Sequence, residues 1–138
     1  MKRFTAIVLV LLAGFCTASR LQAQSTEVRA NIPFSFFVGN KLLPSGNYRF
    51  YPQHDELLVI QNLHQPIGVL SHVADLNGPS RDYPPHLTFV KFGDRYFLSE
   101  IHCASVEMNG EIPRSKLERQ AQVEESSMAP QRIELAAY

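Results

Sequence analysis

The sequence predicts an all-β domain, mainly an antiparallel barrel or sandwich, with a short C-terminal α-helix. Three observations support this fold class. Apolar and polar residues alternate along 28–38. Turn-forming residues recur about every eight to twelve positions between apolar runs. Ser115-Lys116-Leu117-Glu118 has the pattern of a helix capping box. The pattern is compatible with a closed barrel and with a two-sheet sandwich.

The first predicted strand covers 28–38. Every even position in it is apolar, whereas odd positions include Arg29, Asn31 and Ser35, so one face is expected to be buried. Pro33 lacks the amide hydrogen that a central strand would donate to its neighbour. This strand is therefore expected at a sheet edge, or with a bulge near Pro33.

Turn signals divide the middle of the chain. Leu43-Pro44-Ser45-Gly46 matches a type I turn and leads into a return strand that begins at 48–51. The apolar segments 57–62 and 67–73 predict a hairpin. The Pro- and Gly-containing segment 74–85 predicts the longest loop, and long loops often carry binding functions.

The segments 86–92 and 95–103 flank Gly93-Asp94, which predicts a hairpin with a two-residue turn. In that register the side chains of His86 and His102 point to opposite faces of the sheet, so a metal site that uses both is excluded. Both faces also carry large apolar side chains, and such a sheet needs a cover on each side. The C-terminal helix is the first expected cover of the second face, and a second subunit or an apolar ligand are the alternatives.

The C-terminal part of the chain is predicted to be helical. Asn109-Gly110 indicates a turn, and the capping box at Ser115 begins a helix that is expected to run to about Glu125. The residues after 130 are expected to form a short docked helix or a tail. The chain is thus divided into a signal peptide at 1–23, an antiparallel β-domain at 24–112, and a C-terminal helix and tail at 113–138.

The N-terminus has the three-part layout of a secretory signal peptide. Lys2 and Arg3 precede the apolar run 4–15, and a polar stretch follows, with cleavage expected after Ala23. The apolar run is shorter than the ~20 residues that a membrane-spanning helix needs. We therefore expect an exported protein, periplasmic or extracellular, without a transmembrane anchor.

The composition excludes some classes of function. The 138 residues include 13 Lys and Arg against 13 Asp and Glu. This balance argues against nucleic acid as a partner, because phosphate binding depends on a basic field. Cleavage after Ala23 removes Cys16 and leaves Cys103 as the single cysteine, so packing rather than a disulfide is expected to hold the domain.

No motif predicts catalytic residues, a cofactor or a metal site. Gly-x-Ser-x-Gly, His-Glu-x-x-His and Cys-x-x-Cys patterns are absent from the sequence, and the histidines lack the spacing of a zinc site. His54, Asp55 and Glu56 resemble an acid–base cluster, but polar residues at such a position usually form a solvated turn. The leading hypothesis is a non-enzymatic domain that binds or packs in the cell envelope. The alternative is a small exported hydrolase or isomerase that uses these three residues near the 74–85 loop.

The residues of the strands also suggest an interaction surface. The 86–103 hairpin is apolar on both faces, and Phe37 is an aromatic residue among the otherwise polar odd positions of the first strand. The candidate surface consists of Phe37, Phe89, Tyr96, Leu98 and His102. The expected partner is a protein or a small apolar ligand, with a homodimer as a further alternative.

Four motifs resemble those of a family of small exported bacterial proteins of unknown function. They are Asn31-Ile32-Pro33-Phe34-Ser35-Phe36-Phe37-Val38-Gly39-Asn40, Leu43-Pro44-Ser45-Gly46-Asn47-Tyr48, Gly93-Asp94-Arg95-Tyr96-Phe97-Leu98 and Pro113-Arg114-Ser115-Lys116. The resemblance covers about residues 27 to 120 and implies an exported compact domain, without an activity, cofactor or catalytic residue. An aromatic residue usually stands near position 102 in this family, so His102 is a departure.

Overall fold

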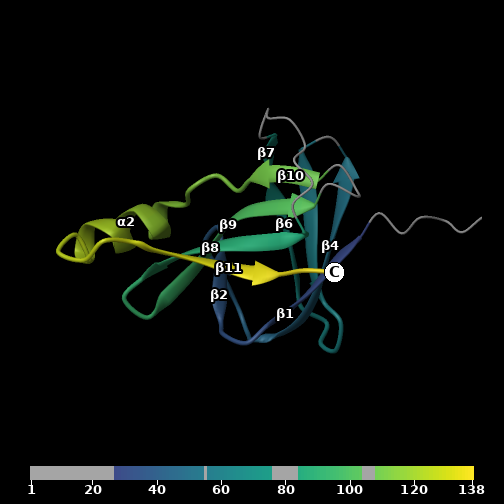
Figure 1. Ribbon diagram of the computed structural model, residues 1–138, viewed down its shortest axis with the longest axis horizontal. Helices are drawn as coiled ribbons and strands as arrows, with labels where there is room; N and C mark the ends of the chain where they lie inside the picture. Colours follow the sequence, from purple (N-terminus) through teal and green to yellow (C-terminus); the bar gives the residue numbers. More distant parts are fainter. Residues whose placement is uncertain (1–26, 55, 76–83, 104–107) are drawn as a thin grey trace, which may run out of the picture.

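A computed structural model describes residues 27–54, 56–75, 84–103 and 108–138. Over these residues the chain forms two β-sheets that pack against each other, with a short helix at one end (Figure 1). The two sheets do not close into a barrel, and the architecture is sandwich-like. The predicted all-β fold class with a short helix is therefore confirmed, and the sandwich is the alternative that the chain adopts.

Sheet A is antiparallel throughout its described strands. In spatial order it contains β1 (Val28–Ile32), β4 (Gly46–His54), β5 (Leu57–Asn62) and β6 (Gly68–His72). The predicted hairpin of 57–62 and 67–73 is thus confirmed as β5 and β6. Its turn is held by the buried Asn62, whose Oδ1 accepts hydrogen bonds from the backbone N–H groups of His64 and Gln65 at 2.8 and 3.0 Å.

Sheet B is mixed. Its main path in spatial order is β11 (Gln131–Ala136), β8 (His86–Phe92), β9 (Arg95–Cys103), β10 (Met108–Glu111) and β7 (Ala74–Asp75). Two further short strands, β2 (Phe36–Val38) and β3 (Lys41–Leu43), form a hairpin, and β2 lies parallel to β9. The predicted bounds of the 86–92 and 95–103 strands agree with β8 and β9.

The core lies between the two sheets and draws side chains from both. The largest buried members are Tyr48, Phe50 and Ile60 from sheet A, with Phe36, Leu87, Phe89, Leu98 and Ile101 from sheet B. Phe36 makes edge-to-face contacts with Tyr48 and Phe89, with ring centroids 5.2 and 5.5 Å apart. Burial of each such side chain contributes about 1.5–3 kcal/mol, so this core is a main source of the stability of the fold.

The first predicted strand divides between the two sheets at Pro33. β1 is the edge strand of sheet A, and β2 continues the same alternation in sheet B. Val28, Ile32 and Phe36 are all buried, as the even positions require. The chain leaves the ladder of sheet A at the residue that cannot donate a backbone hydrogen bond, and the prediction of an edge strand is confirmed.

The register of the β8–β9 hairpin changes midway. Between the pair Phe92–Arg95 and the pair Phe89–Leu98, the cross-strand register is the one expected for a two-residue turn. Beyond them Thr88 lies opposite Glu100, so Ser99 is an extra residue in β9 and forms a β-bulge.

The bulge overturns one prediction. A shift of one residue moves all later side chains to the other face of the strand. Ile101 and Cys103 therefore enter the core, while Glu100 and His102 point outward. The predicted placement of His86 and His102 on opposite faces is wrong, because the two are direct cross-strand partners.

The end of the chain is a strand, and the predicted short helix or tail is wrong. β11 pairs antiparallel with β8 along its full length, from Gln131 opposite Lys91 to Ala136 opposite His86. Beyond it, Tyr138 and Arg29 exchange two backbone hydrogen bonds of 2.8 and 2.9 Å. The last residues thus connect sheet B to the edge of sheet A, and the C-terminal segment is packed as part of the β-sandwich.

The helix α2 (Lys116–Glu124) begins as predicted. Ser115 Oγ accepts a hydrogen bond from the Glu118 N–H at 3.0 Å, which is the N-cap interaction of a capping box. Ala121 and Leu117 of α2 pack on the outer face of sheet B against Phe37, Phe92 and Phe97. The C-terminal helix therefore covers the apolar half of that face, as the sequence predicted.

Asn109-Gly110 is not a turn, because both residues lie inside β10. The glycine is required by close packing. A Cβ at Gly110 would lie 1.8 Å from Cγ1 of Val73, far inside van der Waals contact. The side chain of Val73 fills the space that any larger residue at position 110 would occupy.

Gly110→Ala should therefore destabilise the protein by about 1–3 kcal/mol, the usual cost of overpacking a core. Urea unfolding monitored by circular dichroism measures the loss. Val73→Ala serves as the matched partner, because it removes the atom that the new Cβ would meet. The double variant should lose less stability than the sum of the two single variants, and strict additivity would contradict the proposed clash.

Glu118 predicts a pH dependence of stability. Burial raises the pKa of this carboxyl, although the charge of Arg114 and the Ser115 N–H act in the opposite direction. The folded state therefore favours the protonated form, and its contribution to stability is lost as the pH rises through the folded-state pKa. Glu118→Gln, which keeps a hydrogen-bond acceptor, should gain stability relative to the wild type as the pH increases from about 4. Urea titrations across this range test the trend, and a constant difference at all pH values would contradict it.

Candidate functional site

The five residues of the predicted interaction surface do not share one face. Phe89 and Leu98 are 0% and 2% exposed and belong to the core, so they are not accessible to a partner. Tyr96 is half-buried and packs at the border of the core. Phe37 is half-buried beneath α2, and His102 lies on the outer face of sheet B.

The outer face of sheet B carries a stacked pair of histidines. His86 of β8 and His102 of β9 have ring centroids 4.6 Å apart and an interplanar angle of 21°. His86 Nδ1 lies 2.9 Å from the carbonyl oxygen of Pro84, and His102 Nε2 lies 3.0 Å from Oε2 of Glu100. Arg132, from β11, donates a hydrogen bond to the other oxygen of Glu100. Three strands thus assemble a cluster of two imidazoles, a carboxylate and a guanidinium.

The electrostatics of this cluster centre on Glu100. Burial by itself would raise the pKa of its carboxyl, but the hydrogen bonds and charges of His102 and Arg132 outweigh burial and lower that pKa. Glu100 is therefore ionised at neutral pH and can only accept hydrogen bonds.

The partners of the two histidines fix their tautomers. A carbonyl and a carboxylate oxygen both act as acceptors, so in the neutral imidazoles His86 carries its proton on Nδ1 and His102 on Nε2. The opposite nitrogens, Nε2 of His86 and Nδ1 of His102, then hold unprotonated lone pairs. These two nitrogens can accept a proton or coordinate a metal ion.

The cluster was missed by the sequence analysis because its formation depends on the bulge at Ser99. One signal was present in the sequence: the inward-facing apolar residues Leu98 and Ile101 are three positions apart instead of two. Among the residues that the structure describes, no group of three or more His, Cys, Asp or Glu side chains is placed to hold a metal ion.

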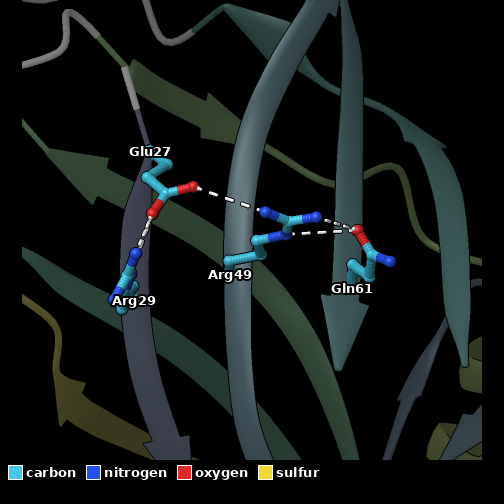
Figure 2. Close-up of polar contacts among 4 residues, drawn as sticks. All are labelled: Glu27, Arg29, Arg49 and Gln61. Atoms are coloured by element: carbon cyan, nitrogen blue, oxygen red, sulfur yellow. Dashed lines mark hydrogen bonds and ion pairs between the residues drawn. The ribbon is translucent and has the colours of Figure 1, made fainter. Parts of the chain in front are cut away.

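The outer face of sheet A carries a second polar arrangement (Figure 2). Figure 2 shows Glu27 between the guanidinium groups of Arg29 and Arg49, which are cross-strand partners. Glu27 Oε1 accepts from Arg29 Nε at 2.8 Å, and Oε2 lies 3.9 Å from Arg49 Nη1. Gln61 Oε1 accepts from Nε and Nη2 of Arg49 at 3.1 and 2.7 Å. The carboxylate offsets the repulsion expected between two like charges placed directly opposite each other.

An apolar row lies beside these polar residues on the same face. Tyr51, Val59 and Leu70 are successive cross-strand partners on β4, β5 and β6. Leu70 is 52% exposed, and the Arg49 guanidinium lies 5.5 Å from the centre of the Tyr51 ring. This face therefore combines an apolar row with a flanking row of charged and amide groups.

The predicted acid–base cluster lies at the end of β4. His54 is exposed, and Glu56 is exposed with a positive φ of 69°. The carbonyl oxygen of Glu56 accepts a hydrogen bond from the N–H of Val73 at 2.8 Å. Asp55 and residues 76–83 of the predicted loop lie outside the described part of the chain. The geometry of His54 and Glu56 is that of a connection between two strands.

Comparison of the chain with protein-family models, curated proteins and solved structures finds no match. The resemblance to a family of exported bacterial proteins accordingly stays a prediction. Within the described ranges, no helix has both the length and the apolar character needed to cross a bilayer. The fold defines the protein as an all-β, sandwich-like domain with a short helix.

The fixed tautomers can be observed directly. Long-range ¹H–¹⁵N correlation spectra at neutral pH should show His86 protonated on Nδ1 and His102 protonated on Nε2. The exposed His54 provides a reference in the same spectrum. Protonation of His86 on Nε2 would mean that its hydrogen bond to Pro84 is not formed in solution.

Proposed function

We propose that the protein is an exported, non-enzymatic β-sandwich domain that binds a protein partner in the cell envelope through the outer face of sheet A. The observation that carries this proposal is the row formed by Tyr51, Val59 and the half-exposed Leu70 beside Arg49 and Gln61. Protein interfaces have an apolar centre with a polar rim and are enriched in Tyr and Arg. The face has this composition.

The arrangement of the rest of the domain favours this face over the other described surfaces. Helix α2 already covers the apolar half of the outer face of sheet B. The free edge of β6 is blocked in part by Lys41, whose Nζ donates a hydrogen bond of 2.6 Å to the carbonyl oxygen of Gly68. Lysine on a sheet edge discourages pairing with another strand. A partner of sheet A would therefore contact its face rather than extend the sheet.

Export is supported by the sequence of the first residues. The basic residues Lys2 and Arg3, the apolar run 4–15 and the polar stretch before Ala23 together have the layout of a cleaved signal peptide. An envelope location would bring the domain together with proteins of the periplasm or the cell surface.

A photo-crosslinking amino acid at Leu70 tests both parts of the proposal. The full chain is expressed in its own cells, the exported fraction is irradiated, and the products are analysed by intact mass spectrometry. We expect a discrete adduct of one partner protein at Leu70, on a chain that begins at Gln24. Val123 is the matched control, because it is 73% exposed on the distant face of α2 and should give no such adduct.

The possible outcomes separate the parts of the proposal. Equal crosslinking at Leu70 and Val123, or none at either, would contradict binding through sheet A. An adduct of twice the mass of the chain would replace the partner protein with a second copy. A chain that keeps residues 1–23 inside the cell would contradict export.

A further inference from the structure

We propose that His86 and His102 form a two-histidine binding site for a divalent transition-metal ion, of which Cu²⁺ is the strongest binder, on the outer face of sheet B. The two side chains are direct cross-strand partners on β8 and β9, with their rings 4.6 Å apart. Imidazole nitrogen is a preferred ligand for Cu²⁺, Ni²⁺ and Zn²⁺, and Cu²⁺ leads the affinity order. This site is separate from the proposed binding face on sheet A and does not depend on it.

The hydrogen bond between His102 and Glu100 prepares the His102 ring as a ligand. Histidines that bind metal ions usually donate their other ring N–H to a carboxylate or a backbone carbonyl, which fixes the tautomer and raises the basicity of the free nitrogen. His102 donates to the carboxylate of Glu100 at 3.0 Å, and His86 donates to the carbonyl of Pro84 at 2.9 Å. His102 therefore has a carboxylate partner of the kind that supports metal-binding histidines, whereas the hydrogen bond of His86 to Pro84 is exposed.

The two rings must change their relative orientation before both free nitrogens can bind one ion. The rings stack with an interplanar angle of 21°, so their in-plane lone pairs do not converge on one point. A common ion requires rotation of the His86 imidazole about its Cβ–Cγ bond, which exchanges its hydrogen bond to Pro84 for the metal ion, while His102 keeps its bond to Glu100. This torsion is broad for histidine and costs little. Both rings are partly exposed, which leaves room for the rotation and for water at the remaining coordination positions.

The surrounding charges favour a cation. The register places Glu111 opposite Glu100 on β10, and Glu134 opposite Thr88 on β11. Arg132, bound to Glu100, is the basic residue of this group. Carboxylates therefore outnumber cations around the pair, and the local potential attracts a positive ion. Because two histidines supply the protein ligands, the site suits an exchangeable ion and not a closed structural centre.

Copper binding by the purified mature protein tests this inference. Electron paramagnetic resonance of the metal-free protein titrated with Cu²⁺ should show one ion coordinated by two imidazole nitrogens, and calorimetry should give its affinity. His86→Ala and His102→Ala should each remove this signal. His102→Phe keeps a ring stacked on His86 but has no nitrogen ligand, so it should also remove the signal while the urea midpoint stays close to that of the wild type.

Matched controls distinguish the pair from other histidines and from its supporting carboxylate. His54→Ala and His72→Ala alter exposed histidines of sheet A and should leave copper binding unchanged. Glu100→Gln should weaken it about 10–100-fold, the usual effect of losing such a supporting partner. Copper affinity and spectra that survive His102→Phe, or that are lost equally in His54→Ala, would overturn the proposal.

Discussion

The extra residue Ser99 in β9 is the constraint on which both faces of sheet B depend. Before it, Leu98 enters the core and Phe97 faces α2; after it, Ile101 enters the core and His102 faces outward. Without the bulge, the later residues would exchange faces, and the ionised Glu100 would enter the apolar core. Burying an unpaired carboxylate costs far more than a local disruption of the ladder. Because of the bulge, β9 contributes apolar side chains to the core along its whole length and polar side chains to the cluster on the outer face.

Local signals predicted most of the fold, because each depends on residues that are neighbours in the sequence. The turn at Gly93-Asp94 set the bounds of β8 and β9, Pro33 marked the end of an edge strand, and the Ser115 capping box set the start of α2. The expectation for the end of the chain failed because β11 has only a short alternation of Ile133 and Leu135. Its conformation is decided by pairing with β8, which a local pattern does not contain.

The candidate sites were harder to predict than the fold for the same reason. The histidine pair needs the exact register of two strands, and a shift of one residue reverses its geometry. Similarly, Asn109-Gly110 has the composition of a turn, yet Gly110 lies in a strand that pairs with β9 and β7, and the side chain of Val73 requires a glycine at this position. A sequence pattern shows which residues favour turns. Whether such a residue lies in a turn or in a strand depends on pairing and packing with distant segments.

The end of the chain joins these parts of the molecule. β11 supplies Arg132 to the carboxylate that orients His102, and Tyr138, two residues beyond the strand, is hydrogen-bonded to Arg29 on the edge of sheet A. Arg29 in turn shares Glu27 with Arg49 on the outer face of that sheet. The histidine cluster and the face of sheet A are therefore both supported by the pairing of β11, although they lie on different sheets. The β8–β9 register brings His86 beside His102, and the pairing of β11 with β8 adds Arg132. Since the unfolded chain lacks this arrangement, a metal ion bound by the two histidines would stabilise the folded chain over the unfolded one.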